Sequence, residues 1–176
     1  MADVKFIPLS QNSAPEFDAS ESSDQPVIPH ADIMSLLFFA YRDFVGRPDE
    51  ILASMNFGRA HHRVIHFVNI NPGLRVSDLL DILKITKQSL SRVLKQLVQD
   101  GYVEQRPGPV DRRERLLFMT GKGRIFAARL AESQAARIEK ALVEIAPEDR
   151  EVVRRFLRAM VDEAERARVD TVIPPR

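Results

Sequence analysis

Apolar side chains near the middle of the chain recur at the spacing of an amphipathic helix. They occupy positions i, i+3, i+4, i+7 and i+8 of one helical stretch, at Leu90, Val93, Leu94, Leu97 and Val98. Thr86 precedes this stretch and is a suitable N-cap. Residues 76–83 predict a shorter helix, and Lys84-Ile85 predicts a tight turn between the two helices. This pattern indicates a helix-turn-helix.

The helical period ends at Asp100-Gly101. Residues 102–105 predict a strand, and residues 116–119 predict a second strand that returns beside it. Residues 106–111 contain two prolines and a glycine and predict the connecting loop. A helix-turn-helix followed at once by a hairpin is a winged helix.

The flanking segments predict further helices. Asp32 is expected to cap a helix that is apolar almost all round, and Gly46-Arg47-Pro48 is expected to end it before a second helix that runs to about Asn71. Thr120 is expected to cap a long helix over residues 123–145, and Pro147 to begin one final helix. A helix that is apolar on all sides needs cover that a small monomer rarely provides, so we expect a partner subunit.

These elements give a fold class and a domain plan. We expect a mainly α protein with a small β-hairpin wing, in which a winged helix-turn-helix is joined to a helical dimerisation domain. The plan has four parts: an irregular acidic tail at 1–30, a dimerisation helix at 31–57, a DNA-binding domain at 58–124, and C-terminal dimerisation helices at 125–176.

Composition narrows the compartment and the chemistry. The chain of 176 residues has no cysteine, which excludes disulfides and thiolate metal sites. The longest uncharged apolar run, Ile33 to Tyr41, is far shorter than the roughly 20 residues of a membrane span. No signal peptide is visible at the N-terminus. We therefore expect a cytoplasmic protein without membrane contact.

Charge is segregated along the chain although its net value is only +1. Residues 1–57 carry three basic and nine acidic side chains, whereas residues 58–125 carry thirteen basic and six acidic ones. A basic middle between acidic or neutral ends favours a module that binds a polyanion. A solvated surface without a partner is the alternative, which charge by itself does not exclude.

The second helix of a helix-turn-helix enters the DNA major groove, and a wing can reach the minor groove. Glutamine and arginine suit base edges, while serine and lysine suit phosphates or bases. The candidate DNA-binding residues are therefore the polar and basic side chains of this helix and of the predicted loop: Lys87, Gln88, Ser89, Ser91, Arg92, Lys95, Arg106, Arg112 and Arg113.

With these motifs the chain resembles the MarR family of bacterial transcription regulators. The resemblance extends over roughly residues 32–165 and is carried by Arg63–Phe67, Leu79-Leu80, Leu90–Leu97, Asp100–Val103, Asp111–Arg113 and Thr120–Gly123. Its most specific part is the wing signature, Asp-x-Arg followed by Leu/Met-Thr-x-x-Gly. The chain departs from the family in its long acidic tail and in Met119, where a leucine is usual.

The resemblance implies a homodimer with intertwined terminal helices that presents two winged helices to a palindromic operator in double-stranded DNA. It implies that Asp111 braces the wing and that Arg113 is the minor-groove arginine. Members of the family often bind small aromatic acids between their two domains. On this ground Arg59, His62, Arg63 and His66 are candidates for binding a small aromatic or anionic effector.

His62 and His66 lie at i and i+4 of one helix, a spacing that also suits zinc. Two ligands do not close a metal site, and a third would have to come from His30 or from a distant carboxylate. We therefore expect no metal and no other cofactor. The chain contains no nucleophile elbow, phosphate-binding loop or zinc-protease motif, so we expect no enzyme.

The function predicted from the sequence is a sequence-specific DNA-binding transcription regulator. We expect a repressor that an effector releases from DNA. The competing hypothesis is a winged-helix interaction module that docks an acidic protein partner without specific DNA binding.

Overall fold

A computed structural model describes residues 27–173 of the chain. The chain divides into two compact units, residues 1–36 and residues 37–176. Within the first unit the described residues include the start of helix α1, where the Ser35 hydroxyl donates to the carbonyl of Ala31 at 2.8 Å. The predicted acidic tail at 1–30 lies almost entirely outside the described residues.

Helix α1 spans Ala31–Ala53, so the predicted break at Gly46-Arg47-Pro48 is wrong. Proline removes the backbone N–H that would bond the carbonyl four residues earlier. That carbonyl belongs to Phe44, and it accepts instead from Nε2 of Gln134 on a distant helix, at 3.4 Å. Pro48 itself is fully buried, which favours the uninterrupted helix. The expected N-cap is also displaced, since the helix begins at Ala31 and Asp32 lies in its first turn.

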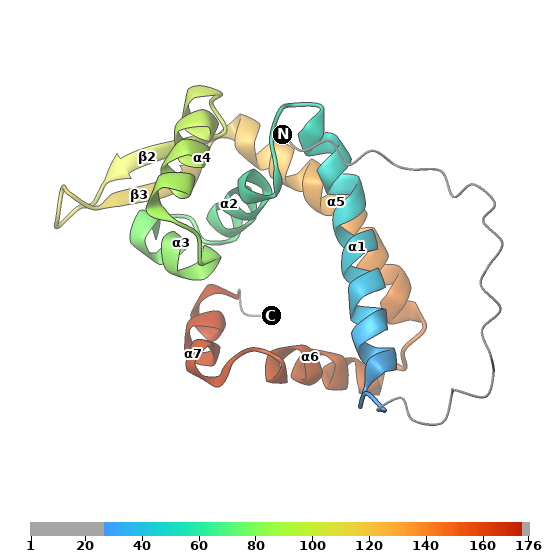
Figure 1. Ribbon diagram of the computed structural model, residues 1–176. Coiled ribbons are helices and arrows are strands. Elements are labelled where there is room, and N and C mark those ends of the chain that lie inside the picture. The colour runs from blue at the N-terminus through green and yellow to red at the C-terminus, as the bar shows by residue number, and fades with distance from the viewer. Residues whose placement is uncertain (1–26, 174–176) are drawn as a thin grey trace, which may run out of the picture. The chain divides into compact units, whose positions relative to one another are not determined.

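Three helices and a small sheet form the winged helix (Figure 1). Helix α2 spans Arg59–Ile70, α3 spans Val76–Leu83 and α4 spans Lys87–Gln99. Lys84 adopts a left-handed conformation in the turn between α3 and α4, with φ 51°. The predicted cap of α4 is confirmed, because the backbone N–H of Ser89 donates to Oγ1 of Thr86 at 3.1 Å.

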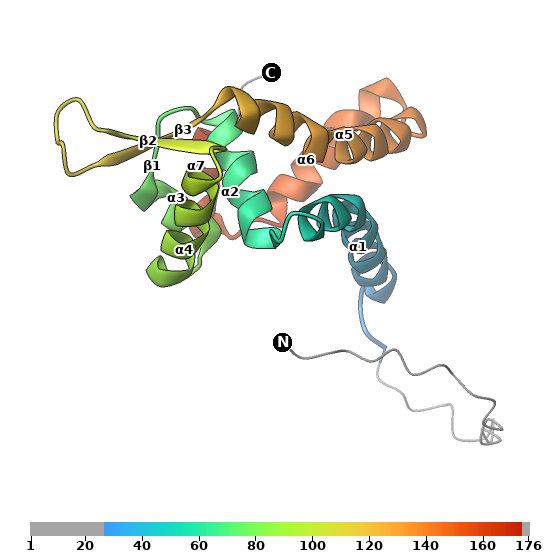
Figure 2. The same ribbon diagram turned by 90° about the horizontal axis from the view of Figure 1, so that it is seen from above.

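The sheet has three antiparallel strands in the order β1-β3-β2. Strand β2 (Val103–Pro107) pairs with β3 (Arg115–Met119), so that Val103 lies opposite Met119. This pair is the predicted hairpin, although β2 extends two residues into the expected loop. Strand β1 (Leu74–Arg75) was not predicted, since two residues are too short to show alternation. The hairpin projects beyond the helices of the winged helix (Figure 2).

The core fills the space between α2, α3, α4 and the sheet, and side chains of α1 and of the helix that follows β3 complete it. Its fully buried side chains are Leu52, Val64, Ile65, Val68, Leu79, Leu90, Leu97, Val103, Leu117 and Leu130. The predicted Thr120 cap of the next helix is confirmed, with the Gly123 N–H donating to Oγ1 at 2.9 Å. A side chain at Gly123 would place its Cβ only 2.0 Å from the carbonyl oxygen of Tyr102. Glycine is therefore needed where this helix begins against the hairpin.

The C-terminal segment differs from the prediction in its last part. Helix α5 spans Gly121–Val143, and Pro147 begins a short 3-10 helix, Pro147–Asp149, before α6 at Arg150–Ala159. One final helix was expected, but the chain leaves the helical conformation after Ala159 and resumes as α7, Glu163–Val172. The Arg166 guanidinium donates to the carbonyls of Ala159 and Val161, which satisfies the backbone at this break.

None of the helices within residues 27–173 is both long enough and apolar enough to cross a membrane.

Candidate nucleic-acid interface

Helix α4 divides into a buried face and an exposed polar face. Leu90, Val93, Leu94 and Leu97 are buried in the core. Lys87, Ser91 and Lys95 follow one another at intervals of four residues, so they form one exposed row along the helix. Gln88 and Arg92 form a second exposed row beside the first.

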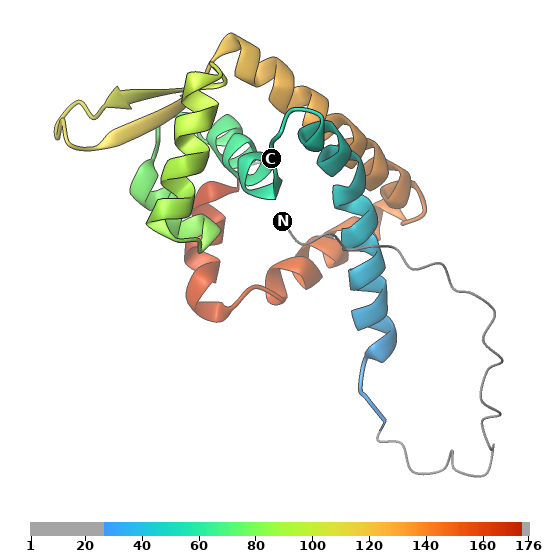
Figure 3. The ribbon, with the colours of Figure 1, turned by 45° about the horizontal axis from the view of Figure 1, so that its top comes forward.

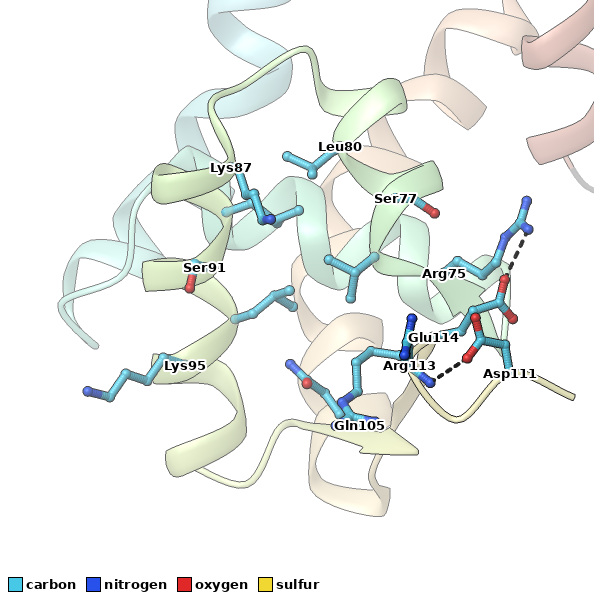
Figure 4. A pocket seen from close by; sticks show the side chains of 14 residues that line it. Arg75, Ser77, Leu80, Lys87, Ser91, Lys95, Gln105, Asp111, Arg113 and Glu114 are labelled. Carbon is cyan, nitrogen blue, oxygen red and sulfur yellow. Dashed lines mark hydrogen bonds and ion pairs between the residues drawn. The ribbon is translucent and has the colours of Figure 1, made fainter. Parts of the chain in front are cut away.

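The row of Lys87, Ser91 and Lys95 borders an open groove of about 690 Å³ between α4 and the wing (Figure 4). We call this feature the groove. Arg75 and Ser77 line it at the start of α3, and Gln105 and Arg113 line it from the hairpin. Five of the candidate DNA-binding or wing-bracing residues thus meet here, namely Lys87, Ser91, Lys95, Asp111 and Arg113.

Several cations in and beside the groove have no acidic partner. Within residues 27–173, no ion pair is formed by Lys87, Arg92, Lys95, Arg112 or Arg113. By contrast, Arg75 pairs with Asp78 at 2.8 Å and Lys84 with Glu165 at 2.9 Å. Unneutralised cations on one surface attract an anionic partner.

The wing is held by backbone hydrogen bonds around Asp111. Its Oδ1 accepts from the backbone N–H of Arg113 at 2.8 Å, and its carbonyl accepts from the N–H of Glu114 at 3.1 Å. The carbonyl of Glu114 in turn accepts from the N–H of Gly108 at 3.1 Å. A Cβ at Gly108 would lie 2.6 Å from the Asp111 carbonyl oxygen, so the loop closes tightly at this glycine.

Arg75 is a residue of this site that the sequence pattern did not identify. Its guanidinium donates to Asp78 through Nε at 2.8 Å and to Glu114 through Nη1 at 3.4 Å. It therefore connects the start of α3 to the base of the wing, as the dashed line in Figure 4 shows. The Arg-x-x-Asp spacing of Arg75 and Asp78 is a local signal for the first contact, but nothing local indicates the second.

His61 was also left out of the predicted sites, and it connects α2 to α4. Its Nδ1 accepts from the backbone N–H of Gly58 at 3.1 Å, so Nε2 carries the proton in the neutral ring. Nε2 lies 3.0 Å from Oε1 of Gln96 on α4. The ring also stacks on Phe57, with centroids 4.7 Å apart.

Arg106 is separated from the other candidates. Successive side chains of a strand point to opposite faces, and Gln105 lines the groove. Arg106 consequently lies on the other face, where it pairs with Glu104 and covers the ring of Phe118 at 4.4 Å. The structure therefore does not place Arg106 with the groove residues. Ser89 takes part in the cap of α4, where its Oγ accepts from the Thr86 hydroxyl.

The four candidate effector residues share a separate cavity of about 200 Å³. These four residues and Phe67 line the cavity from α2. Its other lining residues are Tyr41, Phe44, Val45 and Asp49 of α1 and Gln134 of α5. The cavity thus combines cationic and aromatic side chains. A carboxylate is already present, since Asp49 accepts from Nε of Arg59 at 2.8 Å.

The two imidazoles of this cavity favour the neutral form. Burial lowers the pKa of His62, and the neighbouring His66 lowers it further, while Asp49 and Gln134 act in the opposite direction. Desolvation also lowers the pKa of His66. The hydrogen bond from Arg59 to Asp49 raises the pKa of that guanidinium, which stays charged. Within residues 27–173, no group of three or more metal-ligating side chains is suited to hold an ion.

Sequence comparison decides the family. The sequence model of the MarR family matches residues 56–114, from the end of α1 to the wing. The chain is also 48% identical over 130 residues to the HTH-type transcriptional regulator PetP of Rhodobacter capsulatus, covering 74% of this chain and 78% of PetP. The chain belongs to the MarR family. It is therefore a helix-turn-helix transcription regulator of that family, which confirms the expectation that it is not an enzyme.

Solved structures share the MarR fold at low sequence identity. MarR itself matches with a TM-score of 0.59 at 22% identity, covering 85% of this chain and 99% of MarR. FabT of Streptococcus pneumoniae in complex with DNA matches with a TM-score of 0.62 at 21% identity, covering 73% of this chain and 92% of FabT. NadR in complex with 4-hydroxyphenylacetate matches with a TM-score of 0.63 at 22% identity, covering 76% of this chain and 95% of NadR. These likenesses confirm the predicted winged-helix architecture.

Proposed function

We propose that this MarR-family regulator binds a palindromic DNA operator as a homodimer and represses transcription from it. The observation that carries the proposal is the groove, where Lys87, Lys95 and Arg113 form no ion pair within residues 27–173 and come from two elements that a winged helix applies to DNA. Residues 58–124 act as the DNA-binding domain, and residues 31–57 and 125–176 supply the dimerisation helices.

Each side chain has a proposed contact. Helix α4 enters the major groove, where Gln88 and Arg92 read base edges and Lys87, Ser91 and Lys95 bind phosphates or bases. Ser89, whose hydroxyl oxygen accepts from Thr86, can donate its own hydroxyl hydrogen to a phosphate. Arg113 enters the minor groove from the wing, with Arg112 beside it and Asp111 as the brace. We leave Arg106 out of the interface because it lies on the other face of the hairpin.

Exposed apolar side chains on the remaining helices support the dimer. Residues in and directly after α1, α5 and α6 expose large apolar groups to solvent, namely Phe38, Phe39, Tyr41, Ile138, Val143, Val152, Phe156, Leu157 and Met160. Monomeric proteins rarely expose large contiguous apolar patches, and a second copy of the chain would bury these side chains. Two copies related by two-fold symmetry present two winged helices to two half-sites.

DNA complexes of proteins with the same fold support DNA as the partner of this chain. Besides FabT, a mutant of E. coli MarR was solved with operator DNA, and it matches this chain with a TM-score of 0.56 at 18% identity, covering 77% of this chain and all of that protein. We propose double-stranded DNA as the partner of this chain on the same geometry.

We further propose that a small aromatic or anionic effector binds the cavity of Arg59, His62, Arg63 and His66. The guanidinium of Arg63 and the rings of Tyr41 and Phe67 supply a positive charge and an apolar wall for an aromatic carboxylate. The 4-hydroxyphenylacetate of the NadR complex is a compound of this kind. Binding would release DNA by changing the spacing of the two α4 helices.

Salt dependence tests the proposal against a protein-docking module. Duplexes would first be selected in vitro with the full-length protein, and affinity for the best duplex then measured between about 50 and 200 mM salt. Counterion release lowers affinity with a slope of about −0.9 per phosphate contacted, so six contacts predict a loss of roughly a thousandfold. A docking module for an acidic protein would yield no preferred duplex.

Half-site spacing tests the dimer on DNA. Two-fold symmetry places half-site centres about 10 base pairs apart, on one face of the duplex. An insertion of about five base pairs between them moves the second half-site to the opposite face and should abolish the gain in affinity over one half-site. An affinity that changes neither with the salt concentration nor with the insertion would contradict the proposed function.

A further inference from the structure

Helix α7 lies beside α3 (Figures 1 and 3), and the two helices share a recess. Val76 and Leu80 of α3 line the groove, whereas Asp78 and Asp81 line a recess that α3 shares with α7. At 3.6 residues per turn these two pairs fall on opposite faces of α3. Helix α3 is thus held between the surface proposed for DNA and a helix from the end of the chain.

A side chain of α7 donates a hydrogen bond to a carbonyl at the C-terminal end of α3. The carbonyl of Asp81 lies in the last turn of α3, where carbonyls have no partner within the helix. Nη1 of Arg168 donates to it at 3.2 Å, and Nη2 lies 4.0 Å from the Asp81 carboxylate. Helix α3 has no basic residue in its own last turn. Arg168 therefore supplies the positive charge that favours a helix C-terminus.

Two further contacts fasten α7 at both ends of α3. Nζ of Lys84, in the turn between α3 and α4, donates to Oε1 of Glu165 at 2.9 Å. This hydrogen bond lowers the pKa of the Glu165 carboxyl, so the pair stays charged near neutral pH. Nδ2 of Asn71, which precedes α3, donates to the carbonyl of Val172 at 3.1 Å. Helix α7 thus reaches the turn that sets α4 against α3.

The contacts of α7 are of a kind that can open without unfolding the protein. Lys84 and Arg168 keep 61% and 39% of their side-chain surface exposed, and exposed ion pairs each contribute little to stability. On its other side α7 is tied to α6, because the Arg158 guanidinium binds the Asp170 carboxylate and only residues 160–162 separate the two helices. Helix α6 exposes Phe156, which belongs to the proposed dimer surface.

We propose that α7 is a strap through which the dimerisation helices hold the helix-turn-helix of the same chain in the position that reads DNA. This inference rests on the proposed function, since it names what fixes the two α4 helices at one spacing. With the strap detached, each winged helix remains joined to the dimerisation helices through the core that it shares with α1 and α5. Affinity for a correctly spaced operator then falls, and the preference for that spacing weakens.

Charge reversal in α7 tests the strap. Glu165→Lys places an ammonium against Lys84 and Arg168, whereas Glu163→Lys makes the same charge change in the same turn at a residue that forms no ion pair within residues 27–173. We expect Glu165→Lys to lower affinity for the selected operator by about two- to fivefold, the range of an exposed ion pair. It should also reduce the difference between the affinity for that operator and the affinity for an operator lengthened by one base pair. Glu163→Lys should do neither.

Hydrogen exchange and DNA binding together separate the possible failures. Amides of α3 and of the turn at Lys84 should exchange faster in Glu165→Lys than in Glu163→Lys, with or without DNA. Equal exchange and equal affinity in the two variants would overturn the strap alone. An unsubstituted protein that binds no selected duplex would overturn the proposed function, and with it the role of the strap.

A covalent strap tests the connection within one chain. Because the chain has no cysteine, Lys84→Cys with Glu165→Cys introduces only the two thiols wanted, and a short bismaleimide can join them. The joined protein should recover the affinity that the unjoined double variant loses, and it should run as a single chain on a denaturing gel. Joined protein without recovered affinity, or a product of two linked chains, would overturn the proposal.

Discussion

Adjacent positions of the wing strand have opposite roles in this protein. Gln105 lines the groove and Arg106 covers Phe118 on the reverse face, although both are polar and exposed. Positive charge near a wing is therefore a weak predictor of DNA contact. Arg113 differs because it both lines the groove and lacks an acidic partner within residues 27–173.

Arg113→Ala should weaken operator binding by about 1–3 kcal/mol, as for the loss of one specific contact. Its guanidinium forms no ion pair within the part of the chain that the structure describes, so the melting temperature should stay unchanged. Fluorescence anisotropy on the selected duplex and thermal unfolding measure the two quantities. Unchanged affinity would remove Arg113 from the interface.

Arg106→Ala is the matched control, since it removes the same charge from the same hairpin on the other face. We expect a smaller loss of DNA affinity than for Arg113→Ala, together with a slight loss of stability from the uncovered Phe118 ring. Equal losses of DNA affinity in the two variants would contradict the assignment of the faces.

His62 should make the stability of the fold depend on pH. Its folded-state pKa lies below the ordinary value, so between the two values the folded protein binds fewer protons than the unfolded chain. Stability is then complete above about pH 6.5 and decreases as the pH falls through the window below it. His62→Gln should reduce this decrease. Thermal unfolding at about pH 7.5 and about pH 5.5 measures it, and identical pH profiles for both proteins would contradict the assignment.

At the scale of elements, one side chain compensates for the proline within α1. Pro48 leaves the carbonyl of Phe44 without its helical partner, and Gln134 of α5 donates to it at 3.4 Å. Gln134 also lines the cavity with His62 and acts to raise the pKa of that ring, so it connects α1, α2 and α5 at the cavity. A kink or break at the proline is thereby replaced by a contact between helices.

A double-mutant cycle tests this compensation. Gln134→Ala should destabilise the protein by about 1–3 kcal/mol, because a partly buried carbonyl loses its donor. Pro48→Ala restores a backbone N–H for the same carbonyl, so Gln134→Ala should cost less in that background. Denaturant unfolding of the four proteins gives the coupling. Strictly additive effects would show that Gln134 does not replace the missing bond.

At the scale of the whole molecule, the apolar surface of α6 predicts the oligomeric state. Phe156→Glu places a charge in the surface that we propose a second copy buries, so it should yield monomers by light scattering. Operator affinity should fall as well, since two linked half-site contacts become one. Val110→Glu is the control for the light scattering alone, because Val110 is 97% exposed in the wing loop, which belongs to the proposed DNA surface and not to this one. A Phe156→Glu protein that stays a dimer would contradict the interface.

The sequence by itself determined the elements whose signals are local. Thr86 and Thr120 were correctly predicted as caps, because a cap needs only a side-chain oxygen and an amide three residues later. The apolar spacing of α4 predicted its buried face, and the turn residues between the strands predicted the wing. Family membership followed from the same short motifs, since they encode the helix-turn-helix and the hairpin directly.

Only the tertiary structure decided what depends on residues far apart in the chain. Gln134 donates to the carbonyl that Pro48 leaves without its helical partner, β1 pairs with β3, and Arg168 of α7 contacts the last turn of α3. The face of Arg106 depends on a strand register that propensity does not encode. In each case the deciding partner is distant in sequence, so the energy that selects the conformation appears only when the chain has folded.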